Sequence, residues 1–382
     1  MEFSLIFEAQ LPHPTPDREK AVLRSCVEQA VFAEEMGFDR IWAVEHHGLR
    51  RYAHMTSPEI FLSWVAARTS RIRIGHGVVC MPFNYNHPVR VAERAAMLDV
   101  LSNGRLDLGA GRGGTIQEMT LFGVDVERTA AEVREALCII GSAWRGEGFE
   151  WHGEMLDIVT PPVGEHRIMP EPVQLPHPPL YLACTSPQTI VTAANYGVGA
   201  LIFGFGGLDE VRMKRKMYDE AVATRTGDEL VSTEIRNSLS ALCPTIVLND
   251  DPERAKQIGA GGQRFFTQSS LHWYAGAPEP DEDTENDDNI EYMRSAGAKV
   301  TAQLEAAGIE LPPGIDPTSA YNVDHAYGNA HRAIEYVEAL EDAGADEILA
   351  IVQMGTVPYD VCMETIRQWG ETVIPYFRKR EG

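Results

Sequence analysis

The sequence predicts an α/β protein built on a closed (β/α)8 barrel of the TIM type, with an insertion after the seventh strand. Short apolar runs alternate with amphipathic helical segments, which is the pattern of βαβ units and a parallel sheet. Eight such units follow one another along the 382 residues, a length that one barrel domain accommodates. One long segment, residues 263–325, breaks this rhythm. We therefore interpret residues 1–382 as a single barrel domain with an insertion or lid at residues 263–325.

Each expected element follows from local signals. The first apolar run is followed by a helix start, because Thr15 can cap a helix, Pro16 suits its first position and Asp17 favours its dipole. Apolar residues then recur at three- and four-residue spacing until Gly37. The same reasoning predicts strands at Phe3–Phe7, Arg40–Val44, Ile72–Val79, Leu106–Leu108, Leu180–Cys184, Ala200–Phe203, Leu242–Leu248 and Glu347–Val352, and later helices at Ser57–Ala67, Thr129–Trp144, Gln188–Tyr196, Leu208–Thr224, Arg332–Ala343 and Val357–Phe377.

Composition narrows the function classes. The net charge of −23 disfavours nucleic acid and anionic membranes as partners, and it suits a highly anionic cofactor poorly. The six cysteines are scattered and form no C-x-x-C pair, which is typical of reduced thiols in the cytosol. The N-terminal apolar run is strand-sized, and we find neither a signal peptide nor a spanning helix. We expect a soluble cytoplasmic enzyme.

A carboxylate and two imidazoles follow the second predicted strand. Arg40–Val44 leads directly into Glu45, His46 and His47. The carboxyl ends of barrel strands hold the chemistry of this fold, and an imidazole exchanges protons near neutral pH because its ordinary pKa is about 6.5. In extended chain, neighbouring side chains point in opposite directions, so one imidazole can face the barrel mouth while the other packs into the wall. The residues alone leave open which of the two imidazoles faces the mouth, and the alternative is a pair of structural histidines on a turn.

A glycine-rich loop follows the fourth predicted strand. The run Gly109–Gly114 matches G-x-G-x-x-G, but a dinucleotide fold needs this motif between the first strand of a βαβ unit and its helix, and Thr115–Gly123 is not a clean helix. The glycines, Gly111 among them, instead allow a flat ligand to approach the backbone, and Arg112 offers phosphate a fork of donors. The alternative is a surface turn with a solvated arginine.

A second anion site is predicted between the fifth strand and its helix. Thr185, Ser186 and Thr189 bring hydroxyl groups to a helix N-terminus, whose free N–H groups and dipole favour an anion. Simple capping by Ser186 is the alternative. Together with Arg112 from the preceding loop, phosphate binding becomes the favoured interpretation. The sequence has no zinc-binding spacing and no G-x-S-x-G elbow, so we expect neither a metal nor an acyl-transfer nucleophile.

These segments together resemble the bacterial luciferase-like flavin monooxygenases. The resemblance covers essentially the whole chain and rests on Glu45-His46-His47, Gly104–Gly109 leading to Arg112, Thr185-Ser186, Asn86–Arg90, His272-Trp273-Tyr274 and Ile374-Pro375-Tyr376. Two departures put light emission in doubt, because Gly111 replaces a cysteine near the flavin and Thr185 replaces an acidic residue near the phosphate.

The resemblance implies a barrel that binds reduced FMN (FMNH2) noncovalently and uses O2 as co-substrate. It implies that His46 is the catalytic histidine, that Arg112, Ser186 and Thr189 contact phosphate, and that Gly77-Val78 is a non-prolyl cis peptide beside the flavin. It further implies that the segment around residues 274–288 is a mobile loop. In similar proteins the second and third helices form a dimer interface, and we expect a homodimer.

We predict a two-component monooxygenase that oxidises a small organic substrate through a flavin C4a-(hydro)peroxide, with FMNH2 supplied by a separate NAD(P)H:flavin reductase. In this mechanism His46 and Glu45 are the catalytic residues: His46 serves as general base or hydrogen-bond partner, and Glu45 orients it. Trp42, Met81 and Phe203 are candidates for a dry wall around the site, with the acidic segment as lid. Two alternatives stay open: an F420-dependent oxidoreductase performing hydride transfer on the same barrel, and a non-catalytic flavin-binding protein. Hydroxylation, Baeyer–Villiger insertion and C–S or C–N cleavage are all compatible with the sequence.

Overall fold

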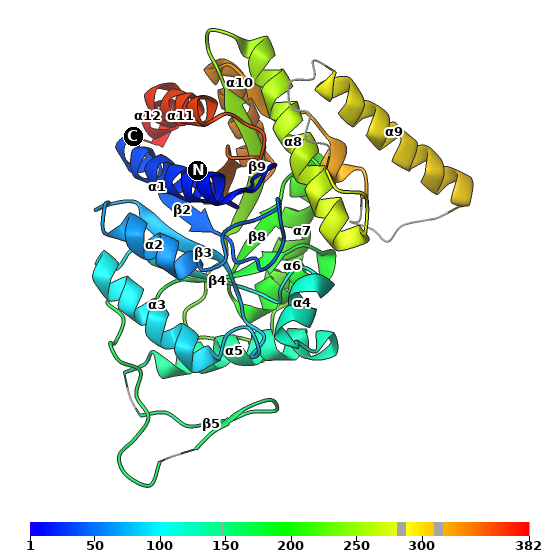
Figure 1. Cartoon of the computed structure of the whole chain (residues 1–382). Coiled ribbons are helices and arrows are strands. Elements are labelled where there is room, and N and C mark those ends of the chain that lie inside the picture. Colours follow the sequence, from blue (N-terminus) through cyan, green and yellow to red (C-terminus); the bar gives the residue numbers. More distant parts are fainter. Residues whose placement is uncertain (147, 160, 281–287, 309–315, 382) are drawn as a thin grey trace.

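The computed structural model of the chain describes residues 1–146, 148–159, 161–280, 288–308 and 316–381. Eight parallel strands close into a ring in the order β9-β11-β1-β2-β3-β4-β7-β8, with β8 pairing back to β9. The predicted TIM barrel is therefore confirmed (Figure 1). The strands of the ring are β1 (Glu2–Phe7), β2 (Arg40–Ala43), β3 (Arg73–Cys80), β4 (Leu106–Gly111), β7 (Leu180–Cys184), β8 (Gly199–Phe203), β9 (Leu239–Val247) and β11 (Glu347–Ile351).

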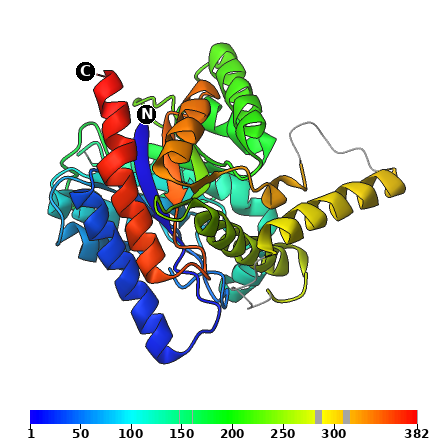
Figure 2. The ribbon, with the colours of Figure 1, turned by 90° about the horizontal axis from the view of Figure 1, so that it is seen from above.

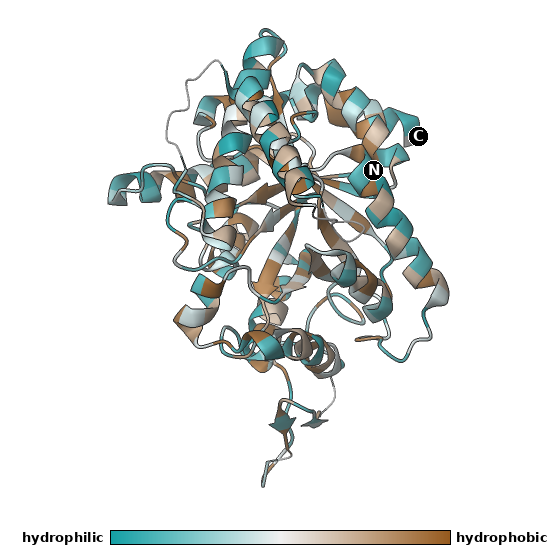
Figure 3. Cartoon of the chain, turned by 90° about the vertical axis from the view of Figure 1, so that its right-hand side faces the viewer, coloured by the Kyte–Doolittle hydropathy of each residue, from teal (hydrophilic) through white to brown (hydrophobic). Residues whose placement is uncertain are grey.

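Helices surround the ring, with apolar strands inside and hydrophilic outer helix faces (Figures 2 and 3). They are α1 (Pro16–Glu35), α2 (Pro58–Ala66), α3 (Pro88–Ser102), α4 (Ile116–Phe122), α5 (Thr129–Ala143), α6 (Pro187–Tyr196), α7 (Leu208–Thr224), α8 (Pro252–Ala275), α9 (Asn289–Ala307), α10 (Ala330–Asp342), α11 (Tyr359–Gln368) and α12 (Ile374–Glu381). Short elements complete the chain: β5 (Trp151–His152) pairs with β6 (Asp157–Ile158) in an outlying hairpin, and β10 (Ala326–Gly328) pairs in parallel with the end of β9.

Three elements differ from the sequence predictions. A helix, α4, occupies Ile116–Phe122, where we expected none, because Thr115 and Glu118 form a reciprocal capping box at its start. The last predicted helix is divided by a π-helical turn at Trp369–Val373. Helix α8 runs without a break through residue 263 to Ala275, so the helix continues into the segment interpreted as an insertion.

Helix α9 extends away from the barrel (Figures 1 and 2). It packs along α8. Within the acidic segment 279–288, residues 281–287 lie outside the described part of the chain.

A buried charge network fills the N-terminal end of the barrel. The Arg40 guanidinium donates from Nε to Asp107 Oδ2 at 2.7 Å and from Nη1 to Glu347 Oε1 at 2.6 Å. Arg73 donates to the same Asp107 oxygen at 2.7 Å, and Ser240 donates to Glu347 Oε2 at 2.6 Å. These contacts join β2, β3, β4, β9 and β11. The charges are therefore paired and hydrogen-bonded, the condition under which buried charges are tolerated.

A layer of aromatic rings lies directly above this network. Trp42 is fully buried and donates its indole N–H to Glu347 at 3.1 Å. Its ring meets Tyr181 edge-on with centroids 5.0 Å apart. A Cβ on Gly75 would lie 2.3 Å from the indole, and one on Gly77 would lie 3.2 Å from Trp42 Cβ. Both glycines therefore give room to the Trp42 side chain.

The network predicts that Arg40→Met destabilises the fold by about 3–5 kcal/mol, because Glu347 would remain buried without its charged partner. Urea unfolding measures this change in the free energy of unfolding. The matched control is Arg90→Met, which breaks an exposed pair with Glu93 and should cost less than about 1 kcal/mol. A similar small effect for both variants would contradict the structural importance of the network.

Candidate active site

The predicted catalytic residues lie at the C-terminal end of the barrel. His46 follows β2 and Arg112 follows β4, and both strands run parallel in the ring. The two residues are linked through α4, because Glu118 of this helix contacts His46 six residues after Arg112. The imidazole and the candidate phosphate contact therefore share one end of the molecule, as the sequence predicted.

His46 is held by Glu118. Its Nδ1 lies 2.9 Å from Glu118 Oε1, and the same oxygen accepts from the His47 backbone N–H at 3.0 Å. The other carboxylate oxygen accepts from the Thr115 backbone N–H at 3.0 Å and from its hydroxyl at 2.9 Å. Glu118 is fully buried, and every one of these contacts favours its ionised form. The carboxylate therefore fixes a proton on Nδ1 of His46 and leaves Nε2 for chemistry.

The pKa values follow from these contacts. Burial alone would raise the pKa of Glu118, but its hydrogen bonds from His46, His47 and Thr115 lower it overall. Burial alone would lower the pKa of His46, but the Glu118 hydrogen bond and the charges of Glu8 and Glu118 raise it overall. The site thus favours an ionised carboxylate beside an imidazole that readily accepts a proton.

Glu45 has a different partner from the one we expected. Its Oε1 lies 3.0 Å from His47 Nε2, and its Oε2 accepts from the Cys80 backbone N–H at 2.9 Å. Asn86 donates a further hydrogen bond to Oε1 at 2.9 Å. The expectation that Glu45 orients His46 is wrong, because adjacent side chains leave the strand in opposite directions. Glu45 anchors His47, and Glu118 anchors His46.

Aromatic side chains cover the two imidazoles. The Tyr52 ring meets His46 edge-on at 5.4 Å and also contacts Phe266 and Tyr274 of α8. His47 instead stacks near Tyr85 and meets Phe122 of α4 at 4.7 Å. Helix α8 is anchored here by the Trp273 indole, which donates to the Arg50 carbonyl at 3.2 Å. The C-terminal end of α8 therefore lies over His46.

Gly77, Val78 and Gly111 form a wall of small residues beside the candidate site. The backbone is as expected, but the chain's own side chains occupy the space beside the glycines. The Gly77–Val78 peptide is cis, as the family resemblance implied. A Cβ on Gly111 would lie 2.4 Å from the Val78 side chain, so this glycine gives room to valine. Of the predicted wall residues, Trp42 and Met81 are fully buried and Phe203 is partly buried. Trp42 lies in the layer below the wall because its indole binds Glu347.

The candidate phosphate residues lie on adjacent strands. The register of β4 and β7 places Ala110 beside Leu182, and an added Cβ on Gly111 would be 3.9 Å from Ala183 Cβ. Arg112 and Thr185, which follow these strands, are exposed. Ser186 and Thr189 form a reciprocal capping box at the start of α6, with Thr189 Oγ1 accepting from the Ser186 N–H at 3.1 Å. Capping is thus present, and phosphate binding by these residues stays a prediction.

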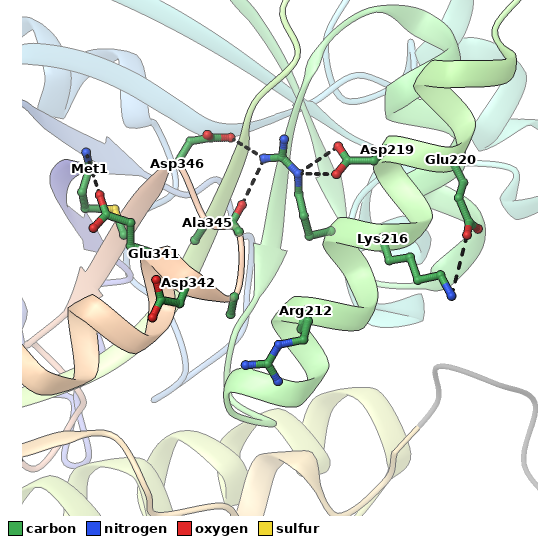
Figure 4. A pocket seen from close by; sticks show the side chains of 12 residues that line it. Met1, Arg212, Lys216, Asp219, Glu220, Glu341, Asp342, Ala345 and Asp346 are labelled. Atoms are coloured by element: carbon green, nitrogen blue, oxygen red, sulfur yellow. Dashed lines mark hydrogen bonds and ion pairs between the residues drawn. The ribbon is translucent and has the colours of Figure 1, made fainter.

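A hollow with charged walls lies at the opposite end of the molecule. It has a volume of about 650 Å³ and is lined by residues of α7, the end of α10 and the loop that leads into β11 (Figure 4). Most of these charges are paired, as in Arg215 with Asp219 at 2.9 Å and with Asp346 at 3.0 Å. Among the described residues, no three His, Cys, Asp or Glu side chains form a metal-binding group, and no helix is long and apolar enough to cross a membrane.

The geometry predicts that Glu118→Gln lowers the pKa of His46, because the variant loses both a negative charge and the acceptor that fixes the Nδ1 proton. Burial, which disfavours the charged imidazole, is then opposed only by the charges of Glu8 and Glu45. A titration of the histidine ring signals by NMR measures this shift. Glu127→Gln, an exposed carboxylate of the following turn, is the control and should leave His46 unchanged. An equal pKa in all three proteins would exclude Glu118 as the determining partner.

Comparison with known proteins agrees with this architecture. The chain is 26% identical over 332 residues to the oxygenase component of the flavin-dependent trigonelline monooxygenase of Acinetobacter baylyi, covering 86% of this chain and 83% of that protein. It is 30% identical over 192 residues to an F420-dependent glucose-6-phosphate dehydrogenase of Amycolatopsis mediterranei, covering 49% of this chain and 55% of that protein.

A solved structure shows the same fold. The oxygenating constituent of 3,6-diketocamphane monooxygenase of Pseudomonas putida, a type II Baeyer–Villiger monooxygenase in complex with FMN, superimposes with a TM-score of 0.71 over 98% of each chain at 18% identity. The sequence profile of the family described as luciferase-like monooxygenase matches residues 1–309. The chain belongs to the luciferase-like monooxygenase family.

Proposed function

We propose that this protein is an FMNH2-dependent monooxygenase, the oxygenase component of a two-component system whose reduced flavin comes from a separate NAD(P)H:flavin reductase. The proposal rests on one observation: Glu118 fixes Nδ1 of His46 at the same end of the barrel where Arg112 follows β4. The oxygenase-component relative and the FMN-bound structural neighbour support the flavin and the reductase. Family membership supports oxidation with O2.

The residues present fit reduced FMN. Arg112 has an exposed guanidinium that makes no hydrogen bond or ion pair with any described residue, so its donors are available to a phosphate. The start of α6 adds backbone N–H groups and a favourable dipole, beside the hydroxyls of Ser186 and Thr189. Gly77, Val78 and Gly111 form a wall with little side-chain bulk between these groups and His46. Thr185, on the exposed edge, completes the proposed phosphate contacts.

Bound reduced FMN would supply the electrons that activate O2 for transfer of one oxygen atom to an organic substrate. The protein contributes the surroundings. His46 Nε2 accepts or returns a proton at the reacting group, while Glu118 keeps the ring in one tautomer and one orientation. Tyr52 and the C-terminal end of α8 cover the imidazole and exclude water. In this role the C-terminal part of α8 acts as a lid.

The F420-dependent relative favours a second candidate, hydride transfer from F420 on the same barrel. The net charge of −23 opposes it, because the cofactor's tail is strongly anionic. Titration of the purified protein with reduced FMN and with reduced F420 separates the two. We expect saturable binding of FMNH2 and much weaker binding of F420, and the reverse order would replace the proposed cofactor.

We predict that His46→Ala lowers product formation about 10²–10⁴-fold, the usual contribution of a general acid–base group. Oxygen uptake and product are measured with a flavin reductase, NADH and FMN against a phenol, a ketone, a thioether and a tertiary amine, which represent the possible reaction types. Binding of FMNH2 should be unchanged in this variant, whereas Arg112→Ala should weaken binding. Product formation by His46→Ala at the wild-type rate would remove His46 from the mechanism, and oxygen uptake without organic product would indicate a non-catalytic flavin-binding protein.

We also propose a homodimer through α2 and α3. Ile60 and Trp64 on α2 are 67% and 53% exposed, and Met97 and Leu101 on α3 are 54% and 71% exposed. The two helices contact each other, so these apolar side chains belong to adjacent faces. Such a surface suits a twofold contact with a second copy, the commonest symmetry of soluble oligomers.

The dimer predicts that Leu101→Asp shifts the protein from the mass of two chains to that of one, because a carboxylate would be buried in the contact. Light scattering coupled to size-exclusion chromatography measures the mass. The control is Val163→Asp at a residue that is also exposed, at 89%, but lies outside both helices. A wild-type protein with the mass of one chain at all concentrations tested would refute this assembly.

A further inference from the structure

Glu8 lies beside the catalytic imidazole, although it was not among the residues predicted from sequence. It directly follows β1, whose Ser4 points into the barrel toward Glu347, and the alternation of strand residues turns Glu8 to the same side. Its side chain is 4% exposed, and its Oε2 lies 3.9 Å from His46 Nε2. This oxygen is buried and has no hydrogen-bond partner among the described residues.

The vacant nitrogen of His46 faces this carboxyl group. Glu118 occupies Nδ1 at 2.9 Å, so proton exchange at the ring is restricted to Nε2. The 3.9 Å separation from Glu8 exceeds a hydrogen bond, so the two groups do not satisfy each other directly. A buried acceptor without a partner is costly and is expected where a ligand atom completes the bonding. An oxygen atom at an ordinary hydrogen-bond distance of about 2.8 Å from both atoms fits this geometry.

The charges around the pair come from several elements. Burial raises the pKa of Glu8 to about 7, with the positive charge of His46 lowering it and the negative charge of Glu118 raising it. Glu118 of α4 and Glu45 of the β2 loop also act on His46, and Tyr52 and Tyr274 lie close by. The pKa of each tyrosine is raised by burial, so both stay neutral near pH 7. Burial thus brings the pKa of the Glu8 carboxyl closer to the range in which an imidazole ordinarily titrates.

We propose that Glu8 and His46 act as one acid–base pair that binds a substrate oxygen between Oε2 and Nε2. This rests on the proposed monooxygenase function and deepens it. When the substrate hydroxyl loses its proton, the O–H bond breaks, an N–H bond forms at Nε2 and the electron pair stays on oxygen. The protonated Glu8 carboxyl donates a hydrogen bond to the resulting oxyanion. In the reverse direction Nε2 returns the proton.

The pair also restricts the substrate class. A phenol donates its O–H to Nε2 and accepts from the protonated Glu8 carboxyl, whereas a ketone oxygen accepts from that carboxyl and from Nε2 when His46 is protonated. Either oxygen gains negative charge during reaction. A thioether sulfur is a weak acceptor, and a tertiary amine is protonated near neutral pH, so neither matches a neutral carboxyl beside an imidazole. We therefore expect product from the phenol or the ketone among the four probes named above.

The test is the titration of His46 by NMR in the cofactor-free protein. In the wild type, coupling to Glu8 should give two titration steps for the His46 ring signals. Glu8→Gln should give a single step at a lower pKa, because the variant removes a negative charge that favours the imidazolium. Glu19→Gln is the matched control: Glu19 lies 3.7 Å from His54 Nε2 but is 46% exposed, and its loss should leave His46 unchanged.

Turnover provides the second readout. Glu8→Gln should retain FMNH2 binding and lose product formation about 10²–10⁴-fold with the phenol or ketone, in line with the loss of an acid–base group. Glu8→Asp keeps a shorter carboxyl group and should recover part of the rate; it also serves for the titration if the glutamine variant does not fold. Wild-type titration and turnover in the folded variants would overturn the proposal, as would product from the thioether or amine alone. The titration needs no flavin. It therefore tests the coupling of Glu8 and His46 even if the protein proves not to be a monooxygenase.

Discussion

The guanidinium of Arg40 is a full positive charge inside the barrel. Without partners, the free energy cost of burying it would exceed the free energy of unfolding of an ordinary domain. Asp107 of β4 and Glu347 of β11 both neutralise it, and these carboxylates reach it from different sides of the ring. Asp107 is held by Arg73 as well, and the pKa of its carboxyl is lowered despite burial because of the two guanidinium groups. A slip of any one strand by a single residue would turn its charged side chain out of the network.

This fixed register determines what the upper barrel contains. Along β2, Arg40 and Trp42 point inward, and His46 lies three residues beyond the end of this strand, at the C-terminal end of the barrel. The Trp42 indole occupies the space that side chains on β3 would need, since a Cβ on Gly75 would lie 2.3 Å from it. The barrel is therefore layered from its N-terminal end into charge, aromatic rings, a small-residue wall and the imidazole. The layers contact one another, as when the Trp42 indole donates to Glu347 of the charged layer.

The strands, the barrel and the end that carries the site could be predicted because they depend on periodicity along short segments. The position of His46 followed from the same reasoning. The partners could not be predicted in that way: Glu118 is 72 residues from His46 and Glu8 is 38 residues away, so only the folded barrel brings them together. One local signal for Glu118 existed, because Thr115-x-x-Glu118 is a capping box that starts a helix. For Glu8, the alternation of side chains along β1 predicts that it points into the barrel, but it does not predict that His46 lies beside it.

The two adjacent histidines belong to different structural units. His47 is bound by Glu45, which accepts from Asn86 at 2.9 Å; Asn86 in turn accepts from Arg94 of α3 at 2.7 Å, and Arg94 contacts Glu59 of α2 at 3.3 Å. His46 is bound from the other side by Glu118 of α4 and faces Glu8 after β1. A displacement of α2 or α3 therefore reaches His47 first, through a continuous chain of polar contacts. The two chains of contacts meet at Glu118, whose Oε1 binds His46 Nδ1 at 2.9 Å and accepts from the His47 backbone N–H at 3.0 Å, so a displacement of His47 can reach the catalytic imidazole only through the helix that carries this carboxylate or through the charge of Glu45.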